Sequence, residues 1–144
     1  LGATKRGVPP SSSLYRNSRG PILVVTPASV TEQWRKEFRR WGRQLTVATF
    51  TTRQERASTK GAIMQKRQDV VIVSYDCFRL RFAELNAIQW LCGIFDEVHK
   101  LKDAKSQVTL KCMAFSNPRR YGLTGTAMQN NYDELYTLLN WAQP

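Results

Sequence analysis

The chain has 144 residues, of which 42% are apolar and 23% charged, and its formal net charge is +11. This composition is typical of a globular domain and excludes a disordered or fibrous protein. No apolar run approaches the roughly 20 residues that a membrane-spanning helix needs, and no secretory signal is visible. Three cysteines, Cys77, Cys92 and Cys112, are too few and too widely spaced for a disulfide framework or a zinc site. We therefore expect one domain, or a piece of a larger one, with buried thiols, from a reducing compartment and without a membrane partner.

Positive charge is concentrated in the first half of the chain. Residues 1–69 hold 14 Lys and Arg against 4 Asp and Glu, whereas residues 70–144 hold 8 against 7. A surface this basic favours a polyanionic partner, and nucleic acid is favoured over solubility alone as the explanation. Charge also serves solubility, and it does not distinguish DNA from RNA or from an acidic lipid surface.

The apolar pattern predicts alternating strands and helices after an irregular start. Residues 1–20 are rich in proline, serine and basic residues and are predicted to form a loop or an insertion, with residues 21–144 as the folded part. The unbroken apolar run of residues 22–26 is typical of a strand buried on both faces. The later elements predicted in chain order are strands over 45–50, 70–74, 91–95 and 119–123, and helices over 58–67, 75–85, 104–115 and 131–141.

The helix predicted after the first strand has clear start and stop signals. Ser29 and Glu32 have the spacing of a capping box, and Gly42 ends the apolar periodicity. The aromatic residues Trp34, Phe38 and Trp41 recur at helical spacing and are predicted to lie in the core. The basic residues of another face, Lys36, Arg40 and Arg43, are predicted either to be solvated or to contact nucleic acid.

Short connections between alternating strands and helices predict a mostly parallel sheet built from right-handed crossovers. In such sheets ligands bind beyond the carboxyl ends of the strands. Polar residues follow four of the predicted strands at that position: Thr26-Pro27, Ser74-Tyr75, Asp96-Glu97 and Thr124-Gly125-Thr126.

Two adjacent carboxylates, Asp96 and Glu97, come at the end of an apolar strand. Unpaired carboxylates are costly in such surroundings, and a divalent cation would relieve that cost. Mg²⁺ takes one or two carboxylates together with substrate phosphates, which is the arrangement that phosphoryl transfer needs. Alternatively, the two acids only favour the dipole of a helix start. His99 is the only histidine, so neither a histidine-based zinc site nor a Ser-His-Asp triad has support.

Four segments resemble the motifs of Swi/Snf-type superfamily 2 ATPases, in the family's order. Residues 96–103 (DEVHKLKD) resemble motif II, and residues 123–131 (LTGTAMQNN) resemble motif III. Residues 27–38 resemble motif Ia and its helix, and residues 73–76 (VSYD) resemble the next DNA-facing motif. The most similar branch is the one around the Cockayne syndrome group B protein. The resemblance implies a RecA-like three-layer α/β fold with a mostly parallel central sheet.

The resemblance also implies roles for single residues. Asp96 would hold Mg²⁺ through water, and Glu97 would position or activate the water that attacks ATP. The residues implied to couple the nucleotide site to DNA are His99, Thr124, Gly125, Thr126 and Gln129. Those implied to lie along one DNA strand are Thr26, Pro27, Ser29, Ser74 and Tyr75. The implied cofactors are ATP and Mg²⁺, the implied partners are double-stranded DNA or nucleosomes and a second RecA-like lobe of the parent chain, and the implied location is the nucleus.

The sequence departs from the family pattern at several positions. Ala127 and Met128 stand where motif III usually has Pro-Leu, and residues 50–52 (FTT) stand where relatives often have His-Gly. The phosphate-binding pattern G-x-x-x-x-G-K-(S/T) does not occur in the 144 residues. We therefore expect an incomplete first lobe that does not hydrolyse ATP by itself.

Three functions remain open at this point. The favoured one is a part of an ATP-driven translocase on double-stranded DNA, acting in chromatin remodelling or DNA repair. The second is a non-enzymatic basic module that binds nucleic acid after losing its phosphate loop. The third is an RNA helicase of the D-E-x-H class, although such helicases normally have Ser-Ala-Thr in motif III.

Overall fold

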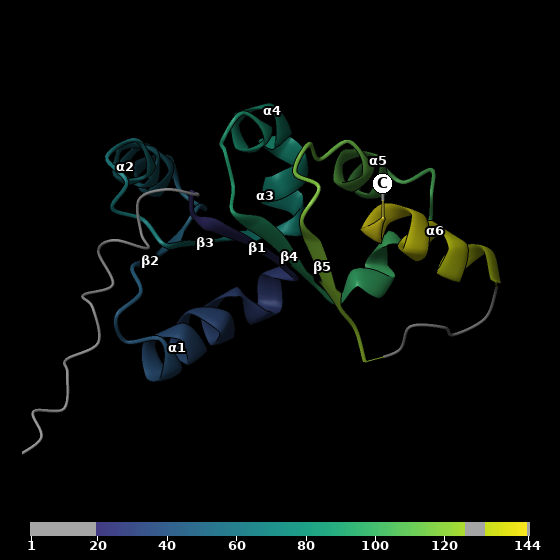
Figure 1. Cartoon of the computed structure of the whole chain (residues 1–144), viewed down its shortest axis with the longest axis horizontal. Helices are drawn as coiled ribbons and strands as arrows, with labels where there is room; N and C mark the ends of the chain where they lie inside the picture. The colour runs from purple at the N-terminus through teal and green to yellow at the C-terminus, as the bar shows by residue number, and fades with distance from the viewer. Residues whose placement is uncertain (1–19, 126–131, 144) are drawn as a thin grey trace, which may run out of the picture.

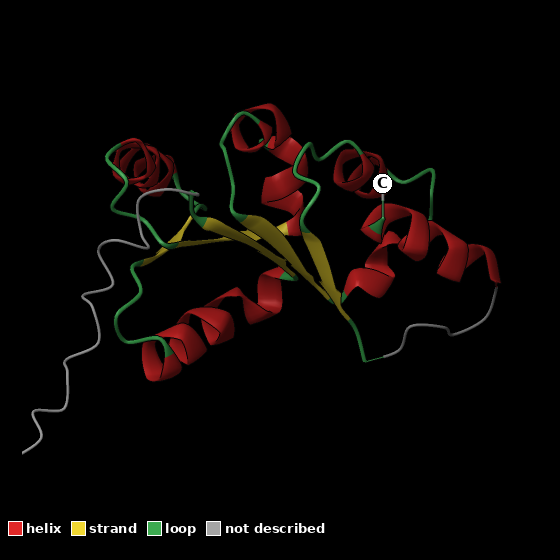
Figure 2. Ribbon diagram, viewed as in Figure 1, coloured by secondary structure: helices red, strands yellow, loops and turns green. Residues whose placement is uncertain are grey.

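The computed structural model describes residues 20–125 and 132–143, which form a five-stranded sheet with helices on both faces (Figures 1 and 2). All neighbouring strands are parallel, in the order β2-β3-β1-β4-β5. The strands are β1 (Ile22–Thr26), β2 (Val47–Thr49), β3 (Val70–Ser74), β4 (Cys92–Asp96) and β5 (Arg120–Leu123). No helix in the described ranges has the length and apolar character needed to cross a bilayer.

The central position of β1 explains why residues 22–26 form an unbroken apolar run. β1 lies between β3 and β4, so its side chains are covered on both faces, and Leu23, Val24 and Val25 have no exposed surface. The register aligns Thr26 with Ser74 and Asp96 with Leu123. The carboxyl ends of four strands therefore meet at one edge of the sheet.

The two faces of the sheet are covered unequally. One helix, α1 (Thr31–Trp41), lies on one face and packs Trp34 and Phe38 against a cluster that includes Val24, Val70 and Ile72 (Figure 1). The larger core lies on the opposite face. The helices there are α2 (Arg53–Met64), α3 (Tyr75–Leu80), α4 (Phe82–Asn86), α5 (Gln107–Met113) and α6 (Tyr132–Ala142). This arrangement gives three layers, as predicted.

Aromatic rings fill the centre of the larger core. Phe95 of β4 contacts Phe78, Phe115 and Trp141 at centroid distances of 5.6, 5.8 and 4.9 Å, with each pair of rings close to edge-to-face. Such pairs add about 0.5–1.5 kcal/mol each beyond the area that they bury. Phe95 therefore fixes the strand that carries the adjacent Asp96.

A guanidinium group ties the ends of several elements together at the other edge of the sheet. Arg120, at the start of β5, donates hydrogen bonds to the main-chain carbonyls of Asn117 and Trp141, over 3.0 and 3.1 Å, and to that of Phe115. The end of α6 and the segment after α5 are thereby held against the start of β5.

The predicted capping box at Ser29 does not form. The backbone turns into a 3-10 helix, η1 (Ala28–Val30), directly after Pro27, and the Val30 amide donates to the Pro27 carbonyl over 3.1 Å. Ser29 therefore lacks the extended conformation that a helix cap requires. α1 begins only at Thr31, without a side-chain cap.

The prediction that Trp41 lies in the core is also wrong, because 76% of its surface is exposed. Trp34 and Phe38 pack against the sheet, but in the last turn of α1 the Trp41 indole N–H donates to Glu37 on its own helix over 2.8 Å. Gly42 ends the helix as predicted, with its N–H on the Phe38 carbonyl.

Other boundaries differ from the sequence prediction in detail. The helix expected over 75–85 is split at Arg81, the helix expected over 58–67 is α2, and the one expected over 104–115 starts at Gln107 behind a Ser106 cap. A second 3-10 helix, η2 (Val98–Lys102), was not predicted. The three cysteines are free, as expected, with Cys92 and Cys112 buried and Cys77 half-buried. Of the predicted loop over 1–20, only Gly20 lies in the described part of the chain.

A true capping box opens α2 instead. The Thr52 hydroxyl accepts from the Glu55 amide over 3.1 Å, and the Glu55 carboxylate accepts from the Thr52 amide over 2.9 Å. The Thr51 hydroxyl and the Thr49 hydroxyl also donate to Glu55. These bonds, with that of Thr51 the largest cause, lower the pKa of Glu55 to about 2.

We predict that Glu55→Gln lowers the free energy of unfolding at pH 7 by about 1 kcal/mol, since the carboxylate caps a helix but faces solvent. A depressed folded-state pKa gives stability that is complete above the unfolded value, near 4.5, and that is lost as the pH falls through about 2. The difference between wild type and variant should therefore shrink across this window in urea unfolding. A difference independent of pH would contradict the role of the charge.

We predict that Gly122→Ala lowers the free energy of unfolding by about 1–3 kcal/mol, because β5 passes too close to its neighbours for a side chain. A Cβ atom at Gly122 would lie 2.9 Å from Val98 Cγ1 and 3.2 Å from the Trp141 ring. Gly61, inside α2, has open space around its Cα, so Gly61→Ala is the matched control and should stabilise by about 0.5–1 kcal/mol. Chemical denaturation measures both, and equal effects would contradict the prediction.

Candidate functional site at the carboxyl edge of the sheet

The carboxyl edge gathers the polar residues that follow four strands. Parallel pairing places Thr26 beside Ser74, and it places Asp96 beside the end of β5, from which Thr124 continues. The four predicted positions therefore belong to one edge, as the topology required.

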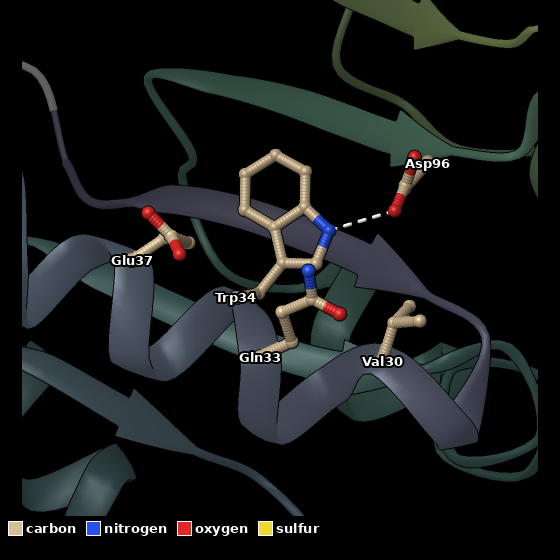
Figure 3. A pocket seen from close by; sticks show the side chains of 5 residues that line it. All are labelled: Val30, Gln33, Trp34, Glu37 and Asp96. Carbon is tan, nitrogen blue, oxygen red and sulfur yellow. Dashed lines mark hydrogen bonds between the residues drawn. The ribbon is translucent and has the colours of Figure 1, made fainter.

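Both carboxylate oxygens of Asp96 accept hydrogen bonds at this edge. Its Oδ2 accepts a hydrogen bond of 2.7 Å from the indole Nε1 of Trp34 on α1, and its Oδ1 accepts one of 2.9 Å from the Glu97 amide (Figure 3). The side chain is half-buried. Each carboxylate oxygen has about two lone-pair positions, so two N–H donors leave acceptor capacity for a further ligand.

A pocket of about 260 Å³ lies between α1 and the end of β4. Its lining residues are Val30, Gln33, Trp34, Glu37 and Asp96 (Figure 3). Four of these come from α1 and its entry, so the helix forms one wall and the strand end the other. An indole, an amide and two carboxylates face the same space.

The backbone of Asp96 is held from the opposite side by Tyr75. Its ring is only 7% exposed, and its hydroxyl donates to the Asp96 carbonyl over 2.7 Å. Burial holds the pKa of the Tyr75 hydroxyl above its ordinary value, so it remains a proton donor. The Tyr75 side chain, predicted to face DNA, is thus in the core, where it joins β3 to the end of β4.

Glu97 has a left-handed backbone, with φ 50° and ψ 47°, a conformation that residues other than glycine rarely adopt. Its Oε2 lies 3.0 Å from His99 Nδ1, and the same nitrogen lies 3.2 Å from the Thr124 hydroxyl. The structure therefore brings three predicted residues, Glu97, His99 and Thr124, into one chain of contacts between β4 and β5.

The other predicted DNA-facing residues differ in accessibility. Thr26 is fully buried, and its hydroxyl bonds with the Pro27 carbonyl and the Thr31 hydroxyl. The Ser74 hydroxyl is half-buried and caps α3 by accepting from the Cys77 amide over 3.2 Å. Ser29 is exposed and Pro27 half-buried, so these two present the most surface. Gly125 is exposed as well, while Thr126 and Gln129 lie outside the described residues.

Comparison with known proteins agrees with this geometry. The model of the SNF2-related domain matches residues 7–144. The chain belongs to this family. This chain is 34% identical to Switch 2 of Arabidopsis thaliana over 97% of its own residues, and 34% identical to the transcription regulatory protein SNF2 of Saccharomyces cerevisiae over 100% of its own residues. It spans only 16% and 9% of those two proteins.

The similarity extends to a human protein and to a solved structure. The "SWI/SNF-related matrix-associated actin-dependent regulator of chromatin subfamily A member 1" is 33% identical over 90% of this chain, which covers 13% of it. The Sulfolobus solfataricus SWI2/SNF2 ATPase core in complex with dsDNA superposes with a TM-score of 0.73 at 24% identity, over 91% of this chain and 26% of that chain. The RecA-like α/β fold and the Swi/Snf resemblance are thereby confirmed.

The residue of this SNF2-related domain that sequence reasoning missed is Trp34, which it assigned to the core alone. The ring does pack against Phe38, with centroids 5.7 Å apart. The overlooked signal is the indole N–H, which usually finds an acceptor when the ring is buried. Only the strand order, with β4 next to β1, shows that this acceptor is Asp96.

We predict that Glu97→Gly raises the free energy of unfolding by about 1 kcal/mol, because a left-handed conformation costs an ordinary residue about 1–2 kcal/mol and glycine almost nothing. Thermal unfolding of the SNF2-related domain measures the change. Glu97→Ala, which keeps the Cβ atom, should give no such gain. Lys66 has a similar φ of 54° outside the site, so Lys66→Gly should stabilise by a comparable amount. A loss of stability in Glu97→Gly beside a gain in Lys66→Gly would contradict the prediction.

Proposed function

We propose that the parent protein of this domain is an ATP-dependent translocase on double-stranded DNA, which acts in chromatin remodelling or DNA repair. The observation that carries the proposal is the position of Asp96 and Glu97. They stand at the carboxyl end of β4, on the edge to which the segments after β1 and β3 also lead. An acidic pair at that edge of a parallel sheet, in a SNF2-related domain, supports nucleotide hydrolysis.

The carboxylate oxygens of Asp96 are suitable for holding Mg²⁺ together with ATP. Mg²⁺ keeps several waters and takes few protein ligands, and no group of three or more His, Cys, Asp or Glu side chains suited to a metal occurs in the described ranges. Asp96 would hold the ion through water with the acceptor positions that Trp34 and the Glu97 amide leave free. When bound, the ion neutralises charge on the phosphates.

Glu97 is proposed as the residue that positions or activates the attacking water. Its contact with His99, and that of His99 with Thr124, supports a path from the nucleotide side to the end of β5. Thr124 and Gly125, and with them Thr126 and Gln129, are proposed to couple the nucleotide state to the grip on DNA.

DNA is proposed to run along the edge formed by the segments after β1 and β3. Ser29 and Pro27 offer the accessible surface there, whereas Thr26, Ser74 and Tyr75 support the edge from within through their hydrogen bonds. One phosphate contact at a helix start is worth at most about 2 kcal/mol, so several must act together. The basic excess of residues 1–69 supports such binding.

A second RecA-like lobe of the parent chain, nucleosomes as substrates and a nuclear location belong to the same proposal. The named relatives that concern chromatin and transcription support it. We further propose that these 144 residues alone do not hydrolyse ATP, since the sequence has no G-x-x-x-x-G-K-(S/T) pattern to hold the phosphates.

The test is ATP hydrolysis by the parent protein, with and without duplex DNA, in wild type and in Glu97→Gln. We expect stimulation by duplex DNA and a loss of roughly 10²–10⁴-fold in the variant, the usual effect of removing a general base. Glu37→Gln, on the same pocket but outside the acidic pair, is the control. Stimulation by RNA alone would favour the helicase of the D-E-x-H class. A parent that binds DNA without any turnover would favour the binding module.

A further inference from the structure

The Trp34 indole connects α1 to Asp96, the carboxylate proposed to hold the metal ion. The helix α1 follows residues 27–29, a segment proposed to face DNA. The hydrogen bond from Trp34 to Asp96 spans 62 residues of sequence and is 2.7 Å long (Figure 3). An N–H donor facing an ionised carboxylate forms one of the stronger kinds of hydrogen bond in proteins. The Trp34 ring also packs on Phe38, which helps to fix its orientation. The indole N–H therefore approaches Asp96 Oδ2 from a defined direction.

The two sides of Asp96 are held by elements that differ in burial. Tyr75, which holds the backbone carbonyl, belongs to the main core. Trp34, which holds the carboxylate, belongs to α1, a helix without a single fully buried residue. The main chain of Asp96 is therefore held from the main core, while its carboxylate is held by the neighbouring Glu97 amide at Oδ1 and by α1 at Oδ2.

The start of α1 is mechanically joined to the segment that presents Pro27 and Ser29. The Thr31 hydroxyl, at the first residue of the helix, lies 3.0 Å from the Thr26 hydroxyl and 3.3 Å from the Pro27 carbonyl. Trp34 follows Thr31 by less than one helical turn. A ligand that displaces residues 27–29 would therefore displace Trp34 as well.

We propose that Trp34 is a positioning residue, which orients the Asp96 carboxylate toward Mg²⁺ and ATP and makes that orientation depend on DNA held at residues 27–29. The inference rests on the proposed function and adds to it a physical link between its two ligands. Partners that orient a metal-binding side chain typically contribute 10–100-fold to metal affinity.

The chain offers a matched control on the same helix. Trp41 also donates its indole N–H to a carboxylate, that of Glu37, but this bond stays within α1 and Trp41 is exposed. Trp34→Phe and Trp41→Phe thus each remove an indole N–H. Only Trp34→Phe removes a hydrogen bond to Asp96. A third variant with 3-benzothienylalanine at position 34 keeps the fused ring and replaces only the N–H, which preserves packing if Trp34→Phe should unfold.

The experiment uses the parent protein and measures the affinity for Mn²⁺ in the presence of a non-hydrolysable ATP analogue, by electron paramagnetic resonance, with and without duplex DNA. In wild type we expect DNA to change the Mn²⁺ affinity. Trp34→Phe and the benzothienylalanine variant should bind Mn²⁺ about 10-fold or more weakly, with DNA affinity within about twofold of wild type and without the effect of DNA on Mn²⁺. Trp41→Phe should behave like wild type.

Equal Mn²⁺ affinity in the Trp34 and Trp41 variants would overturn the proposal, because the bond to Asp96 would then be structural. Weaker Mn²⁺ binding with an unaltered response to DNA would overturn the link between the two ligands. A failure of the proposed function is distinguishable from both, because the wild-type parent itself would then show neither binding of Mn²⁺ with the nucleotide analogue nor turnover stimulated by DNA.

Discussion

A carboxylate at the end of a buried strand needs hydrogen-bond donors, and Asp96 receives them from two layers of this domain. Its oxygens receive an indole N–H from one layer of the fold and a backbone N–H from the next residue, while a buried tyrosine holds its carbonyl from the other layer. Hydrogen-bond donors of this kind offset the cost of removing a carboxylate partly from water. The three layers thus meet at one residue rather than only along the sheet.

The helices cover the two faces of the sheet unequally, and the two faces therefore have different structural roles. The face with Phe78, Phe95, Phe115 and Trp141 is densely packed with aromatic rings and fixes the position of β4. The opposite face carries α1, which contributes partly buried rings and a long exposed surface. A strand end held by a buried aromatic core, beside a helix without a buried residue, is a suitable arrangement for the positioning role proposed for Trp34.

The sequence was most informative where a residue's surroundings depend on few other elements. The runs at 22–26 and 70–74 are apolar because both faces of those strands are covered, and they were predicted with the bounds that the structure has. The position of Asp96 and Glu97 at a strand end followed from the same pattern. The bond between Trp34 and Asp96 did not, because it depends on which strand lies beside β1, and that order is a property of the whole sheet.

Local sequence signals gave a wrong prediction where the backbone adopts a different conformation from the one they indicate. The spacing of Ser29 and Glu32 matches that of Thr52 and Glu55, yet only the second pair forms a capping box. Thr52 is extended, with φ −80° and ψ 165°, whereas Ser29 already lies in a 3-10 turn behind Pro27. The left-handed conformation of Glu97 had no sequence signal, because glutamate has no preference for it.

The hydrogen bonds of Arg120 have a consequence for how this domain can change during evolution. All three acceptors are main-chain carbonyls, so no substitution at Phe115, Asn117 or Trp141 removes the acceptor itself. These hydrogen bonds therefore require no particular side chain at the three positions, whereas the cation–π contact of Arg120 with the Phe115 ring, at 6.0 Å, does depend on a side chain. Lysine is not an equivalent replacement, since one ammonium group cannot reproduce a planar fork that faces three carbonyls in different directions.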